Sequence, residues 1–304
     1  MDRTVSTVID GETCIGCGLC VKVCPSRTIS MQDKRAVVSG DRSLSCGHCA
    51  AVCPVDAIRV SAIDDDTSEF STFRADKNWL PHGEFDTVQL VRLMGSRRSC
   101  RNFKDRPLDH AILDDLVKIG VTAPSATNSQ LWTFTVLPSR KAVLAMGGHI
   151  ARFFKKLNRL SEKRFVRMFL NLVGKENLER YYREYHDSVE EALSEWDKGG
   201  TDMLFHGATA AIVIGSKRGA SCPREDALLA AQNILLAAHS LGLGSCLIGF
   251  AVEAMKGDPG IKITLGIPDD EQVYAVIALG YPDETYRRIP GRKAYTRRYS
   301  EGGI

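Results

Sequence analysis

The sequence predicts an α+β protein of two domains: a small cysteine-rich domain at residues 1–62 and a larger domain of helices and strands at residues 85–304. Three observations support this prediction. The chain has 304 residues, whereas one domain has roughly 100 to 200. Seven of its ten cysteines fall between residues 14 and 53. After residue 86, a few apolar β-branched segments alternate with longer helical patterns.

The first domain contains two related cysteine runs. The segment CIGCGLCVKVCP, at residues 14–25, fits the Cys-x2-Cys-x2-Cys-x3-Cys-Pro run of bacterial two-cluster ferredoxins, whose last cysteine ligates the other cluster. The segment GDRSLSCGHCAAVCP, at residues 40–54, repeats it 29 positions later. The repeat predicts two similar units of strand, cysteine loop, short helix and strand. Ser43 stands where the first run has Cys14.

Two iron-sulfur clusters are therefore expected. Cluster I, of the [4Fe-4S] type, is assigned to four thiolates: Cys14, Cys17, Cys20 and Cys53. Cluster II is assigned to three thiolates and a hydroxyl: Cys24, Cys46, Cys49 and Ser43. A structural zinc module is the alternative, since paired Cys-x2-Cys elements also bind zinc. Runs of three and four cysteines, each ending in Cys-Pro, favour iron and sulfur.

Three outcomes remain open for Ser43. It can ligate a [4Fe-4S] cluster as an alkoxide, the fourth iron can take water or another residue, or cluster II can be a [3Fe-4S] cluster. His48 is a nitrogen ligand nearby, but it corresponds to Leu19 of the first run and is expected to point outward. A serine hydroxyl is a harder and less acidic ligand than a thiol, so the fourth iron should be held less firmly.

Between the two domains, residues 63–84 are polar, acidic at their start and without apolar periodicity, which is typical of a linker. We expect this linker to lie along the second domain, because Trp79, Leu80 and the nearby Phe85 would be costly to leave solvated. Residues 85–103 are then expected to begin as an amphipathic helix and end in a cationic turn, and further helices are expected at residues 111–123 and, long and apolar, at 225–245. Strands are expected at residues 132–139, 208–216 and 273–282.

Composition limits the choice of partners. The formal charge of +3 and the pI near 8.3 give no support for a nucleic acid or a membrane as partner. No stretch of about 18 apolar residues and no signal-peptide pattern are present, which predicts a cytoplasmic protein. Residues 150–199 combine basic, apolar and acidic residues at helical spacing, and we expect a helical insertion or lid there.

Three short stretches of the second domain carry the expected chemistry. SRRSCR, at residues 96–101, concentrates guanidinium groups that suit a phosphate dianion. APSATNSQLW, at residues 123–132, combines small residues with polar side chains before a strand. GLGSCLIGF, at residues 242–250, is a glycine-rich exit from the long helix that allows close approach to the backbone.

In this order and spacing, the three stretches resemble the FMN-dependent nitroreductase family, and the first domain resembles a two-cluster ferredoxin. The resemblance implies a ferredoxin-like iron-sulfur domain fused to a nitroreductase-like α+β flavin domain. It implies FMN bound at a homodimer interface. It also implies that no side-chain acid or base is needed as a catalytic group, because the flavin carries the chemistry.

The resemblance assigns the FMN site residue by residue. The phosphate and ribityl chain would be bound by an Arg-x-Ser-x-Arg element: Arg97, Arg98, Ser99 and Arg101. A second element would contribute across the dimer interface: Pro124, Ser125, Ala126, Asn128 and Gln130. Leu131 stands where the family usually has proline. The backbone near the flavin N5 edge would come from Leu247, Ile248 and Gly249, and Arg292 or Lys293 would reach the phosphate from the C-terminus.

The other reactive residues are assigned structural roles. Cys100, Cys222 and Cys246 are expected to be small buried hydrophobic residues, and His206 a structural histidine rather than a proton donor.

The sequence thus predicts an oxidoreductase that passes electrons from clusters to a small organic acceptor such as a nitroaromatic, quinone or activated alkene. Reduced ferredoxin or NAD(P)H would be the electron source. Two alternatives stay open: a reductive dehalogenase-like or flavin-directed enzyme, and a non-enzymatic electron-transfer or redox-sensing module.

Overall fold

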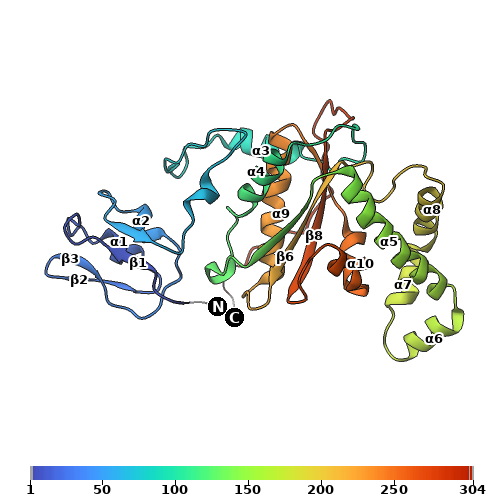
Figure 1. Ribbon diagram of the computed structural model, residues 1–304, viewed down its shortest axis with the longest axis horizontal. Coiled ribbons are helices and arrows are strands. Elements are labelled where there is room, and N and C mark those ends of the chain that lie inside the picture. The colour runs from blue at the N-terminus through green and yellow to red at the C-terminus, as the bar shows by residue number, and fades with distance from the viewer. Residues whose placement is uncertain (1–2, 301, 303–304) are drawn as a thin grey trace.

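The computed structural model describes residues 3–300 and 302. Figure 1 shows three parts: a small N-terminal module, a larger domain built on one sheet, and a helical extension at the opposite end of the molecule. We use "module" for residues 1–62, "linker" for residues 63–84 and "C-terminal domain" for residues 85–304.

The module consists of two copies of one unit. The first contains β1 (Thr7–Ile9), α1 (Leu19–Val23) and β2 (Ile29–Gln32), and the second contains β3 (Arg35–Val38), α2 (His48–Ala51) and β4 (Ile58–Val60). β1 pairs with β4 and β2 with β3, both antiparallel. Each unit therefore lends a strand to the other, and neither can bury its apolar residues alone.

The middle of the linker is hydrogen-bonded to the C-terminal domain. It contains a short 3-10 helix, η1 (Asp65–Ser68). The buried Asp115 carboxylate accepts hydrogen bonds from the backbone N–H groups of Ser71, at 2.9 Å, and Thr72, at 2.7 Å. The linker does lie along this domain, but Trp79 is 77% exposed. The expectation that Trp79, Leu80 and Phe85 are shielded is therefore wrong, since Leu80 and Phe85 are also 55% and 53% exposed.

The C-terminal domain is built on a four-stranded antiparallel sheet in the order β5-β6-β8-β7. Its strands are β5 (Trp132–Leu137), β6 (Ala210–Lys217), β7 (Gly244–Leu247) and β8 (Glu271–Gly280). Three of them lie where the sequence predicts strands. β7 was not predicted: the glycine-rich segment near residue 245 pairs with the second half of β8.

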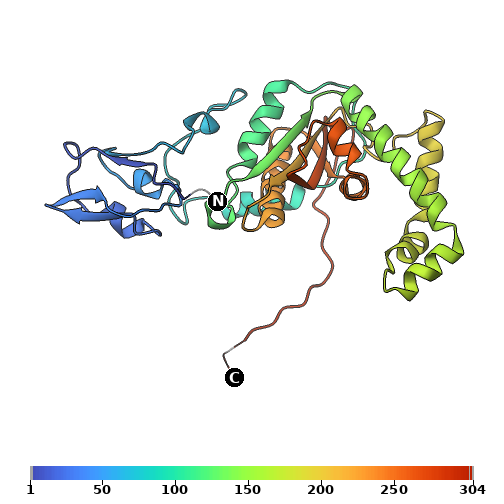
Figure 2. The ribbon, with the colours of Figure 1, turned by 60° about the horizontal axis from the view of Figure 1, so that its bottom comes forward.

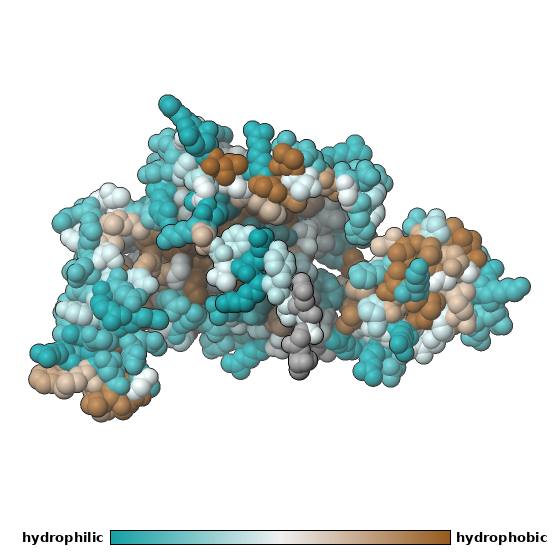
Figure 3. Space-filling view, turned by 180° about the vertical axis from the view of Figure 1, so that it is seen from behind, coloured by the Kyte–Doolittle hydropathy of each residue, from teal (hydrophilic) through white to brown (hydrophobic). Residues whose placement is uncertain are grey.

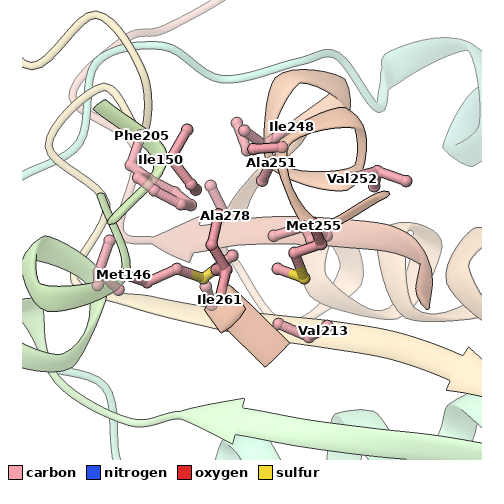
Figure 4. Packing of buried hydrophobic residues seen from close by; sticks show 14 of the residues in the cluster. Met146, Ile150, Phe205, Val213, Ile248, Ala251, Val252, Met255, Ile261 and Ala278 are labelled. Atoms are coloured by element: carbon pink, nitrogen blue, oxygen red, sulfur yellow. The ribbon is translucent and has the colours of Figure 1, made fainter. Parts of the chain in front are cut away.

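Helices cover both faces of this sheet. α4 (His110–Gly120) and α9 (Pro223–Ser240) pack on one face against Ile212, Ile214 and Ile277. α5 (Arg140–Ser161), α10 (Gly249–Gly257) and α11 (Gly260–Thr264) pack on the other. Figure 4 shows Met146, Ile150 and Met255 meeting Val213 and Ala278 there. Alternate residues of β6 and β8 enter opposite cores, as the two-residue period of a strand requires.

The helical extension continues from α5 through α6 (Arg164–Leu172), α7 (Asn177–Glu184) and α8 (His186–Asp197). It projects from the domain at the end remote from the module (Figure 1). α6 leaves Phe165 81% and Leu172 80% exposed, and Figure 3 shows an apolar patch at this end of the molecule.

Two further segments are poorly covered by their own chain. No side chain of α3 (Thr87–Ser96) is buried, and Val88 and Val91 are 73% and 61% exposed. The chain after β8 extends away from the domain (Figure 2), with exposed side chains from residue 285 through residue 300. Within residues 3–300 and 302, no helix combines the length and apolar character of a membrane span.

Candidate functional site

Two pockets in the module bring the cysteines together. Pocket I contains Cys14, Cys17, Cys20 and Cys53, and its other lining is apolar or glycine. Pocket II contains Cys24, Cys46, Cys49 and Ser43. The structure thus groups the residues in the two sets that the crossed ligation pattern predicts. The pockets have similar sizes, about 310 and 320 Å³ including their open mouths.

The cysteines of the module are free thiols. In the described part of the chain, no three His, Cys, Asp or Glu side chains converge tightly enough to hold a single metal ion. The cysteines of the module surround pocket I and pocket II instead.

Backbone N–H groups point at several of these sulfurs. Thr28 N–H donates to Cys24 Sγ at 3.3 Å, and at the equivalent repeat position Ala57 N–H donates to Cys53 Sγ at 3.2 Å. Backbone hydrogen bonds, first from Ala36, lower the pKa of Cys14, whereas burial raises the pKa values of Cys20 and Cys49. N–H groups directed at sulfur stabilise thiolate and cluster charge, so the donor set fits iron-sulfur clusters.

Pocket II is the more polar of the two. Ser43 is 8% exposed, and its Oγ accepts a hydrogen bond from Ser45 N–H at 3.0 Å. Thr28, Ser45 and the exposed His48 also line this pocket. The structure therefore places the Ser43 hydroxyl in the lining of pocket II, beside the three thiols.

In the C-terminal domain, the arginine-rich segment at residues 96–101, which we call the cationic turn, lies beside the glycine-rich segment at residues 242–250. Ser99 forms a parallel bridge with Ser245 of β7, and Cys100 N–H donates to Ser245 O at 3.0 Å. Leu247, the last residue of β7, and Gly249, the first residue of α10, are exposed, whereas Ile248 between them is buried. Two of the three predicted site stretches are thus adjacent.

The cationic turn has the properties of an anion site. Arg98 Nη1 is buried and has no hydrogen-bond partner among the described residues. Burial, followed by the charges of Arg98 and Arg292, lowers the pKa of Arg97, so the C-terminal Arg292 is close enough to act on the same cluster. A buried guanidinium nitrogen without a partner costs free energy unless an acceptor fills the site. These residues therefore fit a phosphate group.

Three neighbouring side chains have altered acidity. Burial, with a contribution from Arg101, lowers the pKa of His206, and the His206 backbone is left-handed, with φ +57°. Burial raises the pKa of Cys100 to about 11 and also raises that of Cys246. The two buried thiols are therefore protonated near neutral pH, consistent with the packing role predicted for them. Cys222 is exposed, contrary to its predicted burial, because it lies in the loop before α9.

The third stretch forms a strained turn before β5, with η2 (Ala126–Asn128) at its centre. Thr127, Asn128 and Gln130 have φ of +55°, +54° and +47°. Left-handed backbone is unfavourable for such residues and is held here by surrounding bonds. Gln130 N–H donates to Ser125 Oγ at 3.1 Å. Pro124 at the start of the turn is exposed.

Sequence reasoning missed the residue that holds this turn. The buried Asp226 of α9 accepts from Ala126 N–H at 2.9 Å and from Ser129 Oγ at 3.2 Å. Trp132 Nε1 donates to the Asp226 carbonyl at 3.1 Å. Asp226 lies in the first turn of a helix, where an acidic residue is common for electrostatic reasons alone, so its sequence position gave no distinct signal.

Within one chain, the turn is not beside the other two stretches. β5 and β7 are at opposite edges of the sheet, three strand spacings apart, which is about 14 Å. Trp132 is level with Gln272 of β8, whereas Leu247 is level with Ile277, a further displacement of about 17 Å along the strands. The structure therefore brings together residues 97–101, 247–249 and 292, and leaves residues 124–130 elsewhere.

Comparison with known proteins identifies two families. Residues 94–281 match the nitroreductase family, and residues 7–60 match the 4Fe-4S dicluster domain. A putative NADH dehydrogenase/NAD(P)H nitroreductase of Archaeoglobus fulgidus is 28% identical over 202 residues, covering 64% of this chain and 87% of the relative. An iodotyrosine deiodinase of Thermotoga neapolitana is 25% identical over 210 residues, covering 68% and 96%.

Among solved structures, a nitroreductase with bound FMN from Bacteroides fragilis aligns with 70% of this chain and 99% of its own, at 20% identity and a TM-score of 0.48. The match to the nitroreductase family model spans more than half of the 304 residues. This chain therefore belongs to the nitroreductase family, and it carries a 4Fe-4S dicluster domain in front of the nitroreductase domain.

Proposed function

We propose that this protein is an FMN-dependent oxidoreductase that passes electrons from two iron-sulfur clusters to a small organic acceptor. The proposal rests on one chain carrying both a 4Fe-4S dicluster domain and a nitroreductase domain. Clusters deliver single electrons, whereas reduction of a nitroaromatic, quinone or activated alkene requires pairs. A flavin supplies two-electron chemistry when bound, so clusters and flavin together convert one-electron delivery into two-electron reduction.

The cofactor assignment rests on Arg98 Nη1, which is buried and has no hydrogen-bond partner in the part of the chain that the structure describes. In our proposal, Arg97, Arg98, Arg101 and Arg292 hold the FMN phosphate, and the backbone at Leu247, Ile248 and Gly249 faces the flavin ring. Ser99 fixes the cationic turn to β7 through its bridge to Ser245. These residues bind and orient the flavin; none is assigned a proton transfer.

We further propose a homodimer in which the turn at residues 124–130 completes the flavin site of the partner subunit. Its distance from β7 within one chain, about 22 Å on the diagonal, supports a site shared between two copies. The exposed apolar side chains of α3 and the extended C-terminal tail support it as well. An isolated ten-residue amphipathic helix with no buried side chain is marginal in water, and a second copy would cover it.

The test uses anaerobically purified, FMN-loaded protein mixed with reduced ferredoxin. Flavin absorption should bleach, and it should return when a nitroaromatic, quinone or activated alkene is added. Arg98→Ala should lose FMN while keeping its iron, since the module does not depend on this residue. If flavin does not bleach while the clusters are reduced, the internal electron path is wrong.

The electron source and acceptor remain open within this proposal. NAD(P)H is the alternative donor, and bleaching by NAD(P)H in a cluster-free preparation would favour it over ferredoxin. Reductive dehalogenation is a second candidate reaction, favoured by the iodotyrosine deiodinase relative, and halide release from a halophenol would detect it. Absence of turnover, together with cluster loss that alters partner binding, would favour a redox-sensing module. The cytoplasmic location stays a prediction.

A further inference from the structure

The loop of pocket II is hydrogen-bonded to the C-terminal domain. Asn128 Nδ2 donates to the backbone carbonyl of Leu44 at 2.9 Å and to that of Ser45 at 3.3 Å. Both acceptors lie between Ser43 and Cys46, two of the predicted cluster II ligands, and both residues line pocket II. Figures 1 and 2 show the green turn of residues 126–128 on the side of the C-terminal domain nearest the module.

Asn128 is well fixed for such a contact. Its Oδ1 accepts a hydrogen bond from Gln130 Nε2 at 2.9 Å, which orients the amide so that its N–H groups face the module. The left-handed backbone at Asn128 is maintained by the turn that Asp226 holds. Because the backbone and the amide group of Asn128 are already held in place, the side chain loses little conformational entropy when it bonds to the module.

The module side of the contact is also structured. Ser45 has φ +49°, its N–H donates to Ser43 Oγ, and its own Oγ lies 3.2 Å from Ser6 Oγ. Successive hydrogen bonds therefore connect Asn128 to Ser45 and Ser45 to Ser43. Pocket I is lined by neither Leu44 nor Ser45.

From these contacts we infer that Asn128 is a positioning residue that docks pocket II against the turn at residues 124–130, so that electrons leave the module through cluster II. This inference rests on the proposed function, in which the same turn borders a flavin. Because the turn would complete the partner's site, each module would serve the flavin bound mainly by the other subunit.

The direction of electron flow follows from the two ligand sets. Pocket II offers one thiolate fewer and a more polar lining, and both features would make a cluster held there easier to reduce. The residues of pocket I would then hold the cluster that accepts single electrons from a reduced ferredoxin-type donor, and the residues of pocket II the cluster that delivers them. Two such electrons, with protons from solvent, would balance the reduction of one flavin.

The test compares Asn128→Ala with Asn233→Ala in FMN- and iron-loaded protein. Asn233 is a suitable control because its Nδ2 makes one hydrogen bond, to Thr122 Oγ1 at 3.0 Å, within the C-terminal domain. The first readout is hydrogen exchange of the backbone amides at residues 43–46. The second is the rate of flavin bleaching by reduced ferredoxin. FMN and iron contents are measured for each variant.

We expect Asn128→Ala to raise exchange at residues 43–46 by roughly tenfold, as loss of hydrogen bonds of ordinary strength allows, and to slow bleaching. Iron content should not change, and bleaching is compared per bound FMN, because Asn128 lies in the turn that we propose to border the flavin. Asn128→Asp should act at least as strongly, since it presents an anion to two carbonyls. Asn233→Ala should match the wild type in both readouts.

Three results would contradict the inference in different ways. Unchanged exchange with lost FMN would mean that Asn128 binds the flavin instead of the module. Faster exchange with unchanged bleaching would mean that electrons leave by another route. If even the wild type does not bleach, the proposed function fails, while the exchange data still decide whether Asn128 docks the module.

Discussion

Pocket I and pocket II arise from the same repeated unit, but they differ in their fourth ligand, their lining and their neighbour. Pocket I has four cysteines in an apolar setting. Pocket II has three cysteines and Ser43, several hydroxyl groups, and a loop bonded to Asn128. The difference indicates that the repeat has specialised, with one half keeping a complete ligand set and the other contacting the C-terminal domain.

The two halves of the repeat share a backbone conformation, although their ligand residues differ. Gly16 and Ser45 occupy equivalent positions, 29 residues apart, and both are left-handed, with φ of +72° and +49°. The same is true of Arg27 and Asp56, with φ of +53° and +52°. The conformation of the cysteine loops is therefore common to both halves, and the functional difference comes from side chains.

The largest effect is expected from removing the cysteines that cross between the units. Cys53→Ala should empty pocket I although Cys53 belongs to the second run, and Cys24→Ala should empty pocket II. Each variant should lose the iron of one cluster, about four of eight atoms if both are [4Fe-4S]. Iron and sulfide analysis with EPR identifies the cluster that remains. Loss of the same signal in both variants would disprove the crossed assignment.

A smaller effect, on stability, is expected from the equivalent positions Gly16 and Ser45. A Cβ at Gly16 would lie 2.0 Å from the Lys34 carbonyl oxygen, in addition to the penalty of about 1–2 kcal/mol for a left-handed alanine. Gly16→Ala should therefore cost about 3 kcal/mol or more. Ser45→Gly relieves strain but loses the Ser6 contact, so its net effect should be within about 1 kcal/mol.

Thermal unfolding of the iron-loaded variants checks this prediction. Gly16→Ala should unfold at a clearly lower temperature than Ser45→Gly. Equal unfolding temperatures would mean that the loop before pocket I rearranges without cost and that the two loops are not equally constrained.

How far the sequence alone could lead differs between the two domains. The module was predictable in detail because cluster ligation ties function to fixed spacings, and the 29-residue repeat set Ser43 in register with Cys14. In the C-terminal domain, β5, β6, β8 and α9 followed from apolar pattern and glycine or proline boundaries. β7 did not, because four residues starting at Gly244 become a strand only by pairing with β8.

The features that the sequence did not predict depend on tertiary contacts. Family resemblance assigned Asn128 to the flavin site, and nothing local indicated that its amide meets Leu44, which is 84 residues away. Asp226 was hidden for the same reason, since its partners lie about 100 residues earlier. Trp79 and the apolar side chains of α3 are exposed for a related reason, since no distant segment of the described chain packs over them.

Chelation should separate the two pockets kinetically. A cluster with three thiolates holds its fourth iron less firmly, so pocket II should release iron to a chelator first, by roughly tenfold in rate. Pocket I should follow slowly, because its thiolate set is complete. EPR spectra taken during chelation check the order. Parallel loss of both signals would mean that solvent access, rather than the missing thiolate, controls iron release.

The smallest effect is expected from exchanging the fourth ligand itself. Ser43→Cys restores the ligand set of pocket I in pocket II, so it should abolish the difference in chelation rate and shift only the cluster II signal. If cluster II is a [3Fe-4S] cluster, the variant should also gain about one iron per chain. If Ser43 already ligates a [4Fe-4S] cluster, iron content should stay constant, because one anionic ligand replaces another, and only the cluster II signal should change.

Ser43→Ala distinguishes the remaining cases, since it removes the hydroxyl while keeping the buried position. Loss of about one iron in this variant would assign the fourth iron to the serine oxygen. An unchanged iron content of eight would assign it to water or another residue, and an unchanged content of seven would indicate a [3Fe-4S] cluster. A change in the cluster I signal in any Ser43 variant would show that the two pockets are not independent, and the distinction drawn between them would then have to be abandoned.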